Sequence, residues 1–169
     1  MFERYTEAAR RTIFFARHEA VIRRGRRIGP EHLLLGLLRE AASGSTMTWP
    51  AQAGSIPDVR AALEGLLPLV DASLAKQDVE SRWAQQILLS NESKRVLQEA
   101  HRSGASRGDP HIGVEHLLLA LLSYSEALTR RLGVGVSAKR FLKGRGLVRE
   151  QLELTARNEP QVDARSEDK

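Results

Sequence analysis

The sequence contains one leucine-rich segment twice, and this duplication restricts the fold more than any other feature. The segment from Ile28 to Leu38 reads Ile-Gly-Pro-Glu-His-Leu-Leu-Leu-Gly-Leu-Leu, and the segment from Ile112 to Leu122 reads Ile-Gly-Val-Glu-His-Leu-Leu-Leu-Ala-Leu-Leu. The copies lie 84 positions apart, and the same offset places Thr6 on Ser90 and Ala16 on Ala100. Two segments that share one register indicate an internal duplication rather than a chance run of leucines.

Each copy predicts the same two consecutive helices. Thr6 and Ser90 are suitable N-caps, because a side-chain oxygen at that position accepts a backbone N–H that has no helical partner, and apolar residues at helical spacing follow both. A second helix begins after Gly29 and after Gly113, and its leucines cover most of the circumference, which is typical of a buried central helix. We therefore expect an all-α protein.

The remaining segments predict the domain limits. Gly, Ser, Thr and Pro in Ala41–Gly54 indicate a loop, and a helix is expected over Pro57–Leu67. Residues 68–79 are interpreted as a connector, and further helices are expected within Ser125–Leu132 and Ser137–Leu154. We expect one domain of two repeats and a disordered polar tail, with limits of 1–154 for the domain, about 1–75 and about 84–154 for the repeats, and 155–169 for the tail.

Composition excludes several classes of protein. The chain has 169 residues and no cysteine, so it has no disulfide, no thiolate metal site and no thiol nucleophile. The start shows no apolar segment of the kind found in secretory signals, and the leucine runs are too short to cross a bilayer. We therefore expect a cytoplasmic location, no membrane partner, and neither a cofactor nor a metal ion.

Arginines 23, 24, 26 and 27 are the densest charge cluster in a chain with a formal net charge of +5. They are interpreted as a solvated helix end and loop, where cations also complement the negative end of the helix dipole. The alternative is a surface for phosphates or an acidic partner. No aromatic or nucleic-acid motif accompanies the cluster, so binding of nucleic acid or another anion is the alternative function.

The two Glu-His pairs, Glu31-His32 and Glu115-His116, are the most conspicuous chemical groups. Adjacent helical residues point about 100° apart, so we expect no metal or acid–base site within one helix. Each histidine is expected to hydrogen-bond a neighbouring backbone group. The glutamates have two open interpretations, either charge pairing with the helix N-terminus or recognition of a guanidinium. No catalytic constellation is present, so we do not expect an enzyme.

Most of the large aromatic residues are expected to pack in the core or against loops, although one could dock a partner: Phe2, Phe14, Phe15, Trp49 and Trp83.

The paired Gly-x-Glu-His helices, each preceded by a capped helix patterned with alanine, resemble the amino-terminal double-repeat domain of the Clp AAA+ unfoldases. The opening Met-Phe-Glu-Arg-Tyr-Thr-Glu-Ala-Ala and the later Leu132-Gly-Val-Gly-Val-Ser resemble the ClpC-type version. The resemblance covers about residues 1–154. It implies a pseudo-twofold pair of four-helix units that receives substrates or adaptors.

The resemblance also implies a binding role for two residues. In ClpC-type domains the glutamate of each Gly-Thr-Glu-His motif helps to bind phosphorylated arginine. The matching residues are Glu31 and Glu115, and Pro30 and Val114 replace the threonines. The implied function is a non-enzymatic protein-binding module whose partners are substrates, adaptors or a Clp ATPase or protease complex. No Gly-x-x-x-x-Gly-Lys-Ser/Thr loop is present in the sequence, so two alternatives stay open: a free-standing repeat protein or a fragment of a larger unfoldase. The polar tail favours the free-standing protein.

Overall fold

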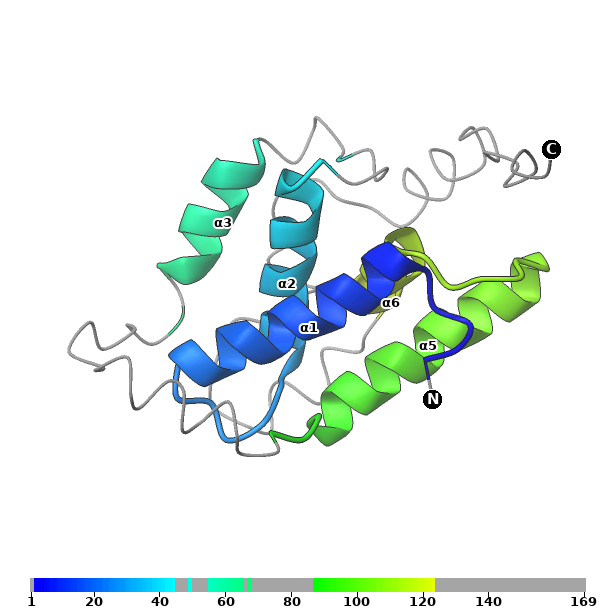
Figure 1. Ribbon diagram of the computed structural model, residues 1–169, viewed down its shortest axis with the longest axis horizontal. Helices are drawn as coiled ribbons and strands as arrows, with labels where there is room; N and C mark the ends of the chain where they lie inside the picture. The colour runs from blue at the N-terminus through cyan, green and yellow to red at the C-terminus, as the bar shows by residue number, and fades with distance from the viewer. Residues whose placement is uncertain (1, 45–48, 50–54, 66, 68–86, 124–169) are drawn as a thin grey trace, which may run out of the picture.

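The computed structural model describes residues 2–44, 49, 55–65, 67 and 87–123, and within these ranges the protein is all-helical (Figure 1). No strand occurs among these residues, so the predicted fold class is confirmed. The other expected helices, the connector and the tail lie outside the described residues. The helices are α1 (Glu7–Ile22), α2 (Pro30–Ala42), α3 (Ile56–Glu64), α5 (Asn91–Arg107) and α6 (Val114–Ser123).

Both outer helices begin at the predicted caps. The Thr6 hydroxyl accepts the N–H of Ala9 at 3.2 Å, and the Ser90 hydroxyl accepts that of Ser93 at 3.1 Å. Each bond satisfies a backbone donor that the helix itself leaves unpaired. The first helix of each repeat therefore begins directly after the cap residue that the sequence predicts.

The structure corrects one predicted helix boundary and places the arginine cluster at the helix end and in the loop that follows. The helix expected over 57–67 runs from Ile56 to Glu64, because Ser55 caps it by accepting the N–H of Asp58 at 3.3 Å. The last turn of α1 contains no basic residue, and Arg23 is already its C-cap. The arginine cluster therefore forms the turn after the helix and does not lie within its last turn.

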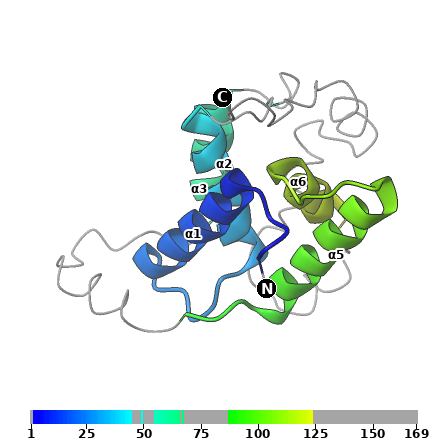
Figure 2. The same cartoon turned by 45° about the vertical axis from the view of Figure 1, so that its right-hand side comes forward.

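The two leucine-rich helices form the centre of the core. Figures 1 and 2 show α1 and α5 as the outer helices, running in opposite directions. Helix α1 packs on α2, α5 packs on α6, and α2 also contacts α6. Leucines 33, 34, 35, 37 and 38 of α2 and leucines 117, 118, 119 and 121 of α6 are at most 2% exposed, which confirms the buried central helices. Burial of each such side chain contributes about 1.5–3 kcal/mol.

Two short backbone contacts join the repeats symmetrically. Tyr5 forms an isolated parallel bridge with Ile112, and Ile28 forms one with Leu89. The offset of 84 positions exchanges the two bridges, since it carries Tyr5 to Leu89 and Ile28 to Ile112. Such reciprocal contacts are the signature of a twofold axis. The tandem repeats are therefore arranged as a pseudo-twofold pair.

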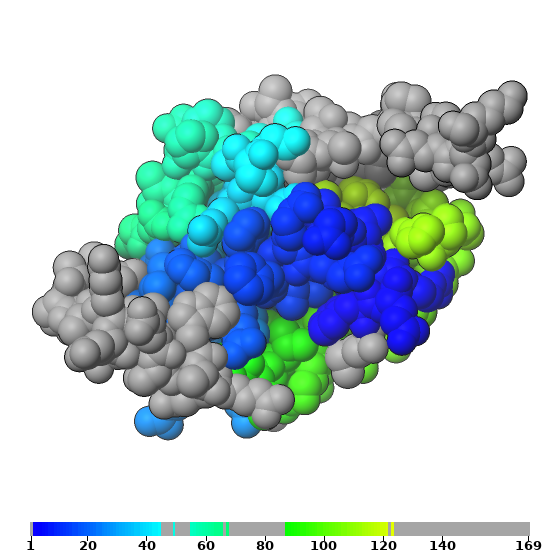
Figure 3. Space-filling view, viewed as in Figure 1, coloured from blue at the N-terminus to red at the C-terminus, as the bar shows by residue number. Residues whose placement is uncertain are grey.

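The crossing of α1 and α2 depends on one glycine. A Cβ atom at Gly36 would overlap the backbone carbonyl of Thr12 and would lie 2.6 Å from the backbone nitrogen of Ala16. The backbones of the two helices therefore touch at this point. Figure 3 shows α1 on the outside of this crossing, between the α2–α3 side and the α5 side of the molecule.

Candidate functional site

The start of α2 is closed by a histidine side chain. Gly29 is the N-cap, Pro30 is the first helical residue, and the Nδ1 atom of His32 accepts the N–H of Gly29 at 2.9 Å. His32 is 7% exposed. This bond satisfies a buried backbone donor, and it confirms that the histidine serves the helix start.

The start of α6 repeats this arrangement. The Nδ1 atom of His116 accepts the N–H of Gly113 at 3.1 Å, and His116 is 3% exposed. Gly113 and His116 lie 84 positions after Gly29 and His32, respectively. The Gly-x-Glu-His motif therefore encodes a local cap, in which the histidine replaces the glutamate or glutamine usually found in a capping box.

Glu31 and Glu115 lie beside these histidines and remain accessible. Their side chains are 31% and 37% exposed, and their Oε1 atoms lie 3.2 Å and 2.9 Å from Nδ1 of His32 and His116, respectively. Although adjacent helical positions point about 100° apart, each carboxylate reaches the neighbouring histidine because the glutamate side chain folds back over the first turn. Each glutamate contacts the histidine of its own helix, so the structure shows two equivalent carboxylates rather than one shared site.

The charge of Glu31 is stabilised locally. Burial raises the pKa of its carboxyl, but the adjacent His32 ring and a hydrogen bond from the Glu31 backbone N–H outweigh burial, so that the pKa lies below its usual value. Glu31 is therefore an anion at neutral pH. A partly exposed carboxylate of this kind can accept hydrogen bonds from a guanidinium.

The second site contains an additional acid. Asp109 Oδ2 lies 2.9 Å from Nε2 of His116, and Arg107 Nε lies 3.8 Å from the same oxygen. In the neutral ring Nδ1 accepts from Gly113, whereas in the protonated ring it donates to Glu115. Burial lowers the pKa of His116, but the two carboxylates outweigh burial and raise the pKa above 6.5. The position equivalent to Asp109 is Gly25, so this pairing is specific to the second repeat.

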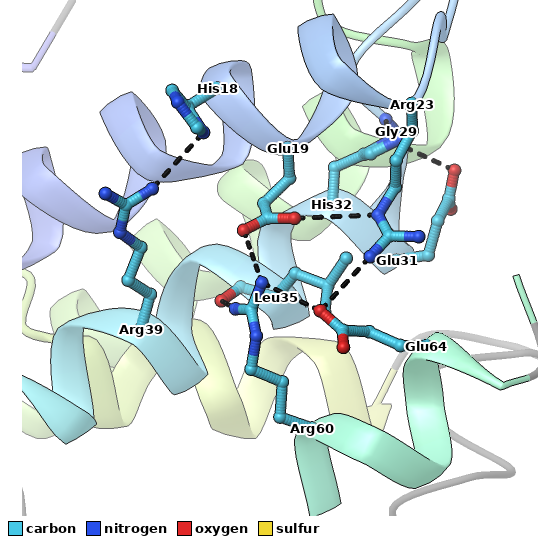
Figure 4. A network of polar contacts seen from close by, with 10 residues as sticks. All are labelled: His18, Glu19, Arg23, Gly29, Glu31, His32, Leu35, Arg39, Arg60 and Glu64. Carbon is cyan, nitrogen blue, oxygen red and sulfur yellow. Dashed lines mark hydrogen bonds and ion pairs between the residues drawn. The ribbon is translucent and has the colours of Figure 1, made fainter. Parts of the chain in front are cut away.

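A buried ionic network joins α1 to α3 (Figure 4). Glu19 is 1% exposed; its carboxylate lies 2.7 Å from Arg60 Nη2 and 3.5 Å from Arg23 Nε. Glu64 Oε1 binds the same two arginines at 2.9 and 3.2 Å. No predicted feature indicated this network, although an acidic residue three positions after Ala16 on the buried face of α1 was a usable signal. The network joins the end of α1 to α3, with Glu19 and Arg23 buried and Arg60 and Glu64 partly exposed.

An apolar cavity of about 260 Å³ lies between the N-terminal segment and α5. Phe2 and Tyr5 form one wall, with ring centroids 5.2 Å apart in an edge-to-face arrangement, and the Tyr5 hydroxyl donates to the carbonyl of Leu97 at 3.3 Å. Phe2 was one of the candidate docking aromatics, whereas Tyr5 was not identified. The remaining lining residues comprise two leucines and three polar or basic side chains: Leu89, Leu97, Lys94, Gln98 and His101.

Other kinds of site find no support in the described part of the chain. No group of three or more His, Cys, Asp or Glu side chains there could hold a metal ion. None of the described helices is long and apolar enough to cross a membrane.

The family assignment agrees with this architecture. The family model of the Clp repeat (R) N-terminal domain matches residues 4–133, which include both Gly-x-Glu-His helices and all of the residues that line the cavity except Phe2. The chain belongs to this family. The Clp repeat accounts for the duplication, since the motif and the capped outer helix occur once in each copy and the two reciprocal bridges join the copies.

Curated relatives of this Clp repeat chain are much longer proteins. It is 28% identical over 139 residues to the chaperone protein ClpB of Oceanobacillus iheyensis, an alignment that covers 81% of the chain and 16% of ClpB. It is 30% identical over 131 residues to the chloroplastic chaperone protein ClpC of Pisum sativum, covering 78% and 13%, respectively. The chain therefore spans less than a fifth of the length of these relatives.

Solved structures support the same fold. The N-terminal domain of the chaperone ClpD from Arabidopsis thaliana matches with a TM-score of 0.61 and 23% identity, covering 92% of this chain and 94% of that domain. The Hsp104 N-terminal domain from Candida albicans matches with a TM-score of 0.58 and 18% identity, covering 92% and 91%, respectively. At these identities the likeness establishes the fold alone.

Proposed function

We propose that this Clp repeat domain is a non-enzymatic module that binds unfolded or extended segments of partner proteins. Domains of this family serve as substrate- and adaptor-binding modules of Clp chaperones. The observation that carries the proposal for this chain is the apolar cavity beside Phe2 and Tyr5, whose volume suits one or two apolar side chains. Lys94 and His101 line the same cavity and supply donors for the carbonyls of a bound peptide.

Peptide binding to the cavity can be tested with a neutral fluorescent peptide that carries a central Leu-Phe pair between glycine, serine and glutamine residues. Phe2→Ala removes part of the wall, and we expect it to weaken binding about fivefold to tenfold, in line with the loss of one buried aromatic contact. Leu88→Ala is the matched control, because Leu88 is 54% exposed and does not line the cavity. Fluorescence anisotropy gives both affinities.

Two results would contradict the proposal. The first is that the wild-type chain shows no binding of the Leu-Phe peptide at about 1 mM, a limit that corresponds to a binding free energy weaker than about −4 kcal/mol. The second is an equal loss of affinity in Phe2→Ala and Leu88→Ala, since that would place the peptide on exposed apolar surface in general.

Glu31 and Glu115 are proposed as a second, charge-selective part of this module. The resemblance to ClpC-type domains suggests phosphoarginine as their ligand, and the partly exposed carboxylates suit its guanidinium. In calorimetry with free phosphoarginine, Glu31→Ala and Glu115→Ala are each expected to reduce the number of sites from two to one. Absence of heat with the wild-type chain would rule out this ligand and leave the cavity proposal intact.

A further inference from the structure

The turn after α1 differs in charge from its counterpart after α5. Residues 23–27 read Arg-Arg-Gly-Arg-Arg and are called here the arginine turn, whereas residues 107–111 read Arg-Gly-Asp-Pro-His. The offset of 84 positions relates the two turns. They occupy equivalent places in the pseudo-twofold fold, so the common architecture does not require the four cations of the first turn.

The backbone of the arginine turn adopts a conformation that favours glycine. Arg24 has a φ of 52°, and its counterpart Gly108 has a φ of 75°. A glycine meets this left-handed geometry without steric conflict, as the second repeat shows, whereas an arginine is strained there. Gly108 shows that this position of the repeat accepts an unstrained glycine. The presence of a strained arginine at position 24 therefore points to a function of the Arg24 side chain.

The arginine turn is also held in place. The Arg23 side chain is 8% exposed and is bound by Glu19 and Glu64 of the buried network. The backbone N–H groups of Arg24 and Gly25 donate to the carbonyls of Val21 and Ala20 at 3.1 and 2.8 Å. The turn therefore has one buried anchor and a fixed path, shown at the lower left of Figure 1.

The other three arginines are directed to solvent. Arg24, Arg26 and Arg27 are all exposed. Within the described residues, no acidic side chain forms an ion pair with Arg26 or Arg27, in contrast to exposed arginines on the helices, where Arg10 pairs with Glu7 and Arg102 with Glu99. The turn thus places Arg26 and Arg27, two exposed cations without an acidic partner among the described residues, next to each other on a preorganised backbone.

We propose that the arginine turn docks an acidic segment, rich in Asp and Glu, of a partner protein. Carboxylates match the forked guanidinium geometry of exposed arginines. A protein partner fits better than nucleic acid, because the turn contains no aromatic side chain on which a base could stack, and the Glu–Arg pairs along α1 and α5 interrupt any longer basic stripe. The arginine turn is a separate surface from the apolar cavity, and the inference goes beyond the proposed function.

The test compares two variants of the full chain that lose the same charge. Arg26→Gln/Arg27→Gln removes two cations from the arginine turn, and Arg95→Gln/Arg102→Gln removes two exposed cations from α5. The probe is a fluorescent peptide of Glu, Asp, Gly and Ser, which has no apolar side chain and therefore does not report on the cavity. Fluorescence anisotropy at low ionic strength, where exposed charges are least screened, gives the affinities. Circular dichroism checks that both variants fold.

We expect the acidic peptide to bind the wild-type chain. Loss of Arg26 and Arg27 should weaken this binding about tenfold, whereas the α5 variant should change the affinity less than about twofold.

Three results would each overturn the proposal: no binding of the acidic peptide, equal weakening in both variants, or tighter binding of single-stranded DNA than of the peptide. The last result would assign the arginine turn to nucleic acid instead.

Discussion

The two repeats share the features that shape the backbone and differ in the side chains around them. Both have a hydroxyl-capped outer helix and a histidine-closed central helix, and two reciprocal bridges join them. Within the described parts of the two repeats, the Glu19 network and the tight crossing at Gly36 occur in the first repeat only. Caps and central leucines thus accompany the same backbone arrangement in both repeats, whereas the turns and outer faces carry different side chains.

Removing Glu19 should produce the largest difference between the repeats. The equivalent residue is Ser103, so Glu19→Ser makes the first repeat resemble the second. The substitution leaves the buried Arg23 and the partly exposed Arg60 with only Glu64 as an acidic partner, and we expect a loss of about 3 kcal/mol in the free energy of unfolding. Urea denaturation measures it. Ser103→Ala, the control, should change stability by less than about 0.5 kcal/mol. A similar small change for Glu19→Ser would show that the network contributes little.

The matched exchanges at the two helix crossings should both lower stability, but for different physical reasons. Gly36→Ala introduces the residue found at the equivalent Ala120, and its Cβ would overlap the backbone of α1, so we expect a loss of about 1–3 kcal/mol. Helix propensity alone predicts a gain of about 1 kcal/mol for the same change. The melting temperature of Gly36→Ala distinguishes the expected loss from the expected gain, and a rise would mean that the crossing is not tight. Ala120→Gly should lose about 1 kcal/mol from propensity.

Exchanging the residues with positive φ should have a smaller effect. Arg24→Gly should stabilise the chain by about 1 kcal/mol, because glycine relieves the left-handed strain. Gly108→Ala should destabilise it by about 1 kcal/mol. Chemical denaturation of both variants provides the check. If Arg24→Gly proved neutral, strain at Arg24 would no longer support a functional role for the arginine turn.

The smallest expected effect is the pH response of the second repeat. Because the pKa of His116 is raised in the folded state, its contribution to stability is complete below the unfolded pKa of about 6.5 and is lost as the pH rises through the folded value. In an NMR titration, Asp109→Asn should lower the midpoint of the His116 ring protons. Identical midpoints in the wild-type chain and the variant would exclude Asp109 as a cause.

The sequence predicts those parts of the fold that depend on local signals. Thr6 and Ser90 mark helix starts because caps act within three residues, and the leucine pattern identifies the buried helices because periodicity reflects exposure. Arg60 and Glu19 are 41 positions apart, and no local pattern reveals that α3 brings them together. The cavity was missed for the same reason, since Tyr5 and Leu97 meet only through the pairing of the repeats.

The repeated motif and the family resemblance identified the two glutamates as candidate residues. Neither predicted where their side chains lie. Spacing along a helix predicts where Cβ atoms point, but Glu31 and Glu115 have long side chains that fold back toward the capping histidines. Such local folding depends on rotamers that the sequence pattern does not specify.

NMR mapping of the neutral Leu-Phe peptide on the isotopically labelled chain tests most directly whether this Clp repeat domain binds extended protein segments in its apolar cavity. The account predicts that the largest chemical-shift changes fall on Phe2, Tyr5, Leu97 and His101, while the arginine turn stays unperturbed. Changes confined to other surfaces, or none at a peptide concentration that saturates binding, would contradict it.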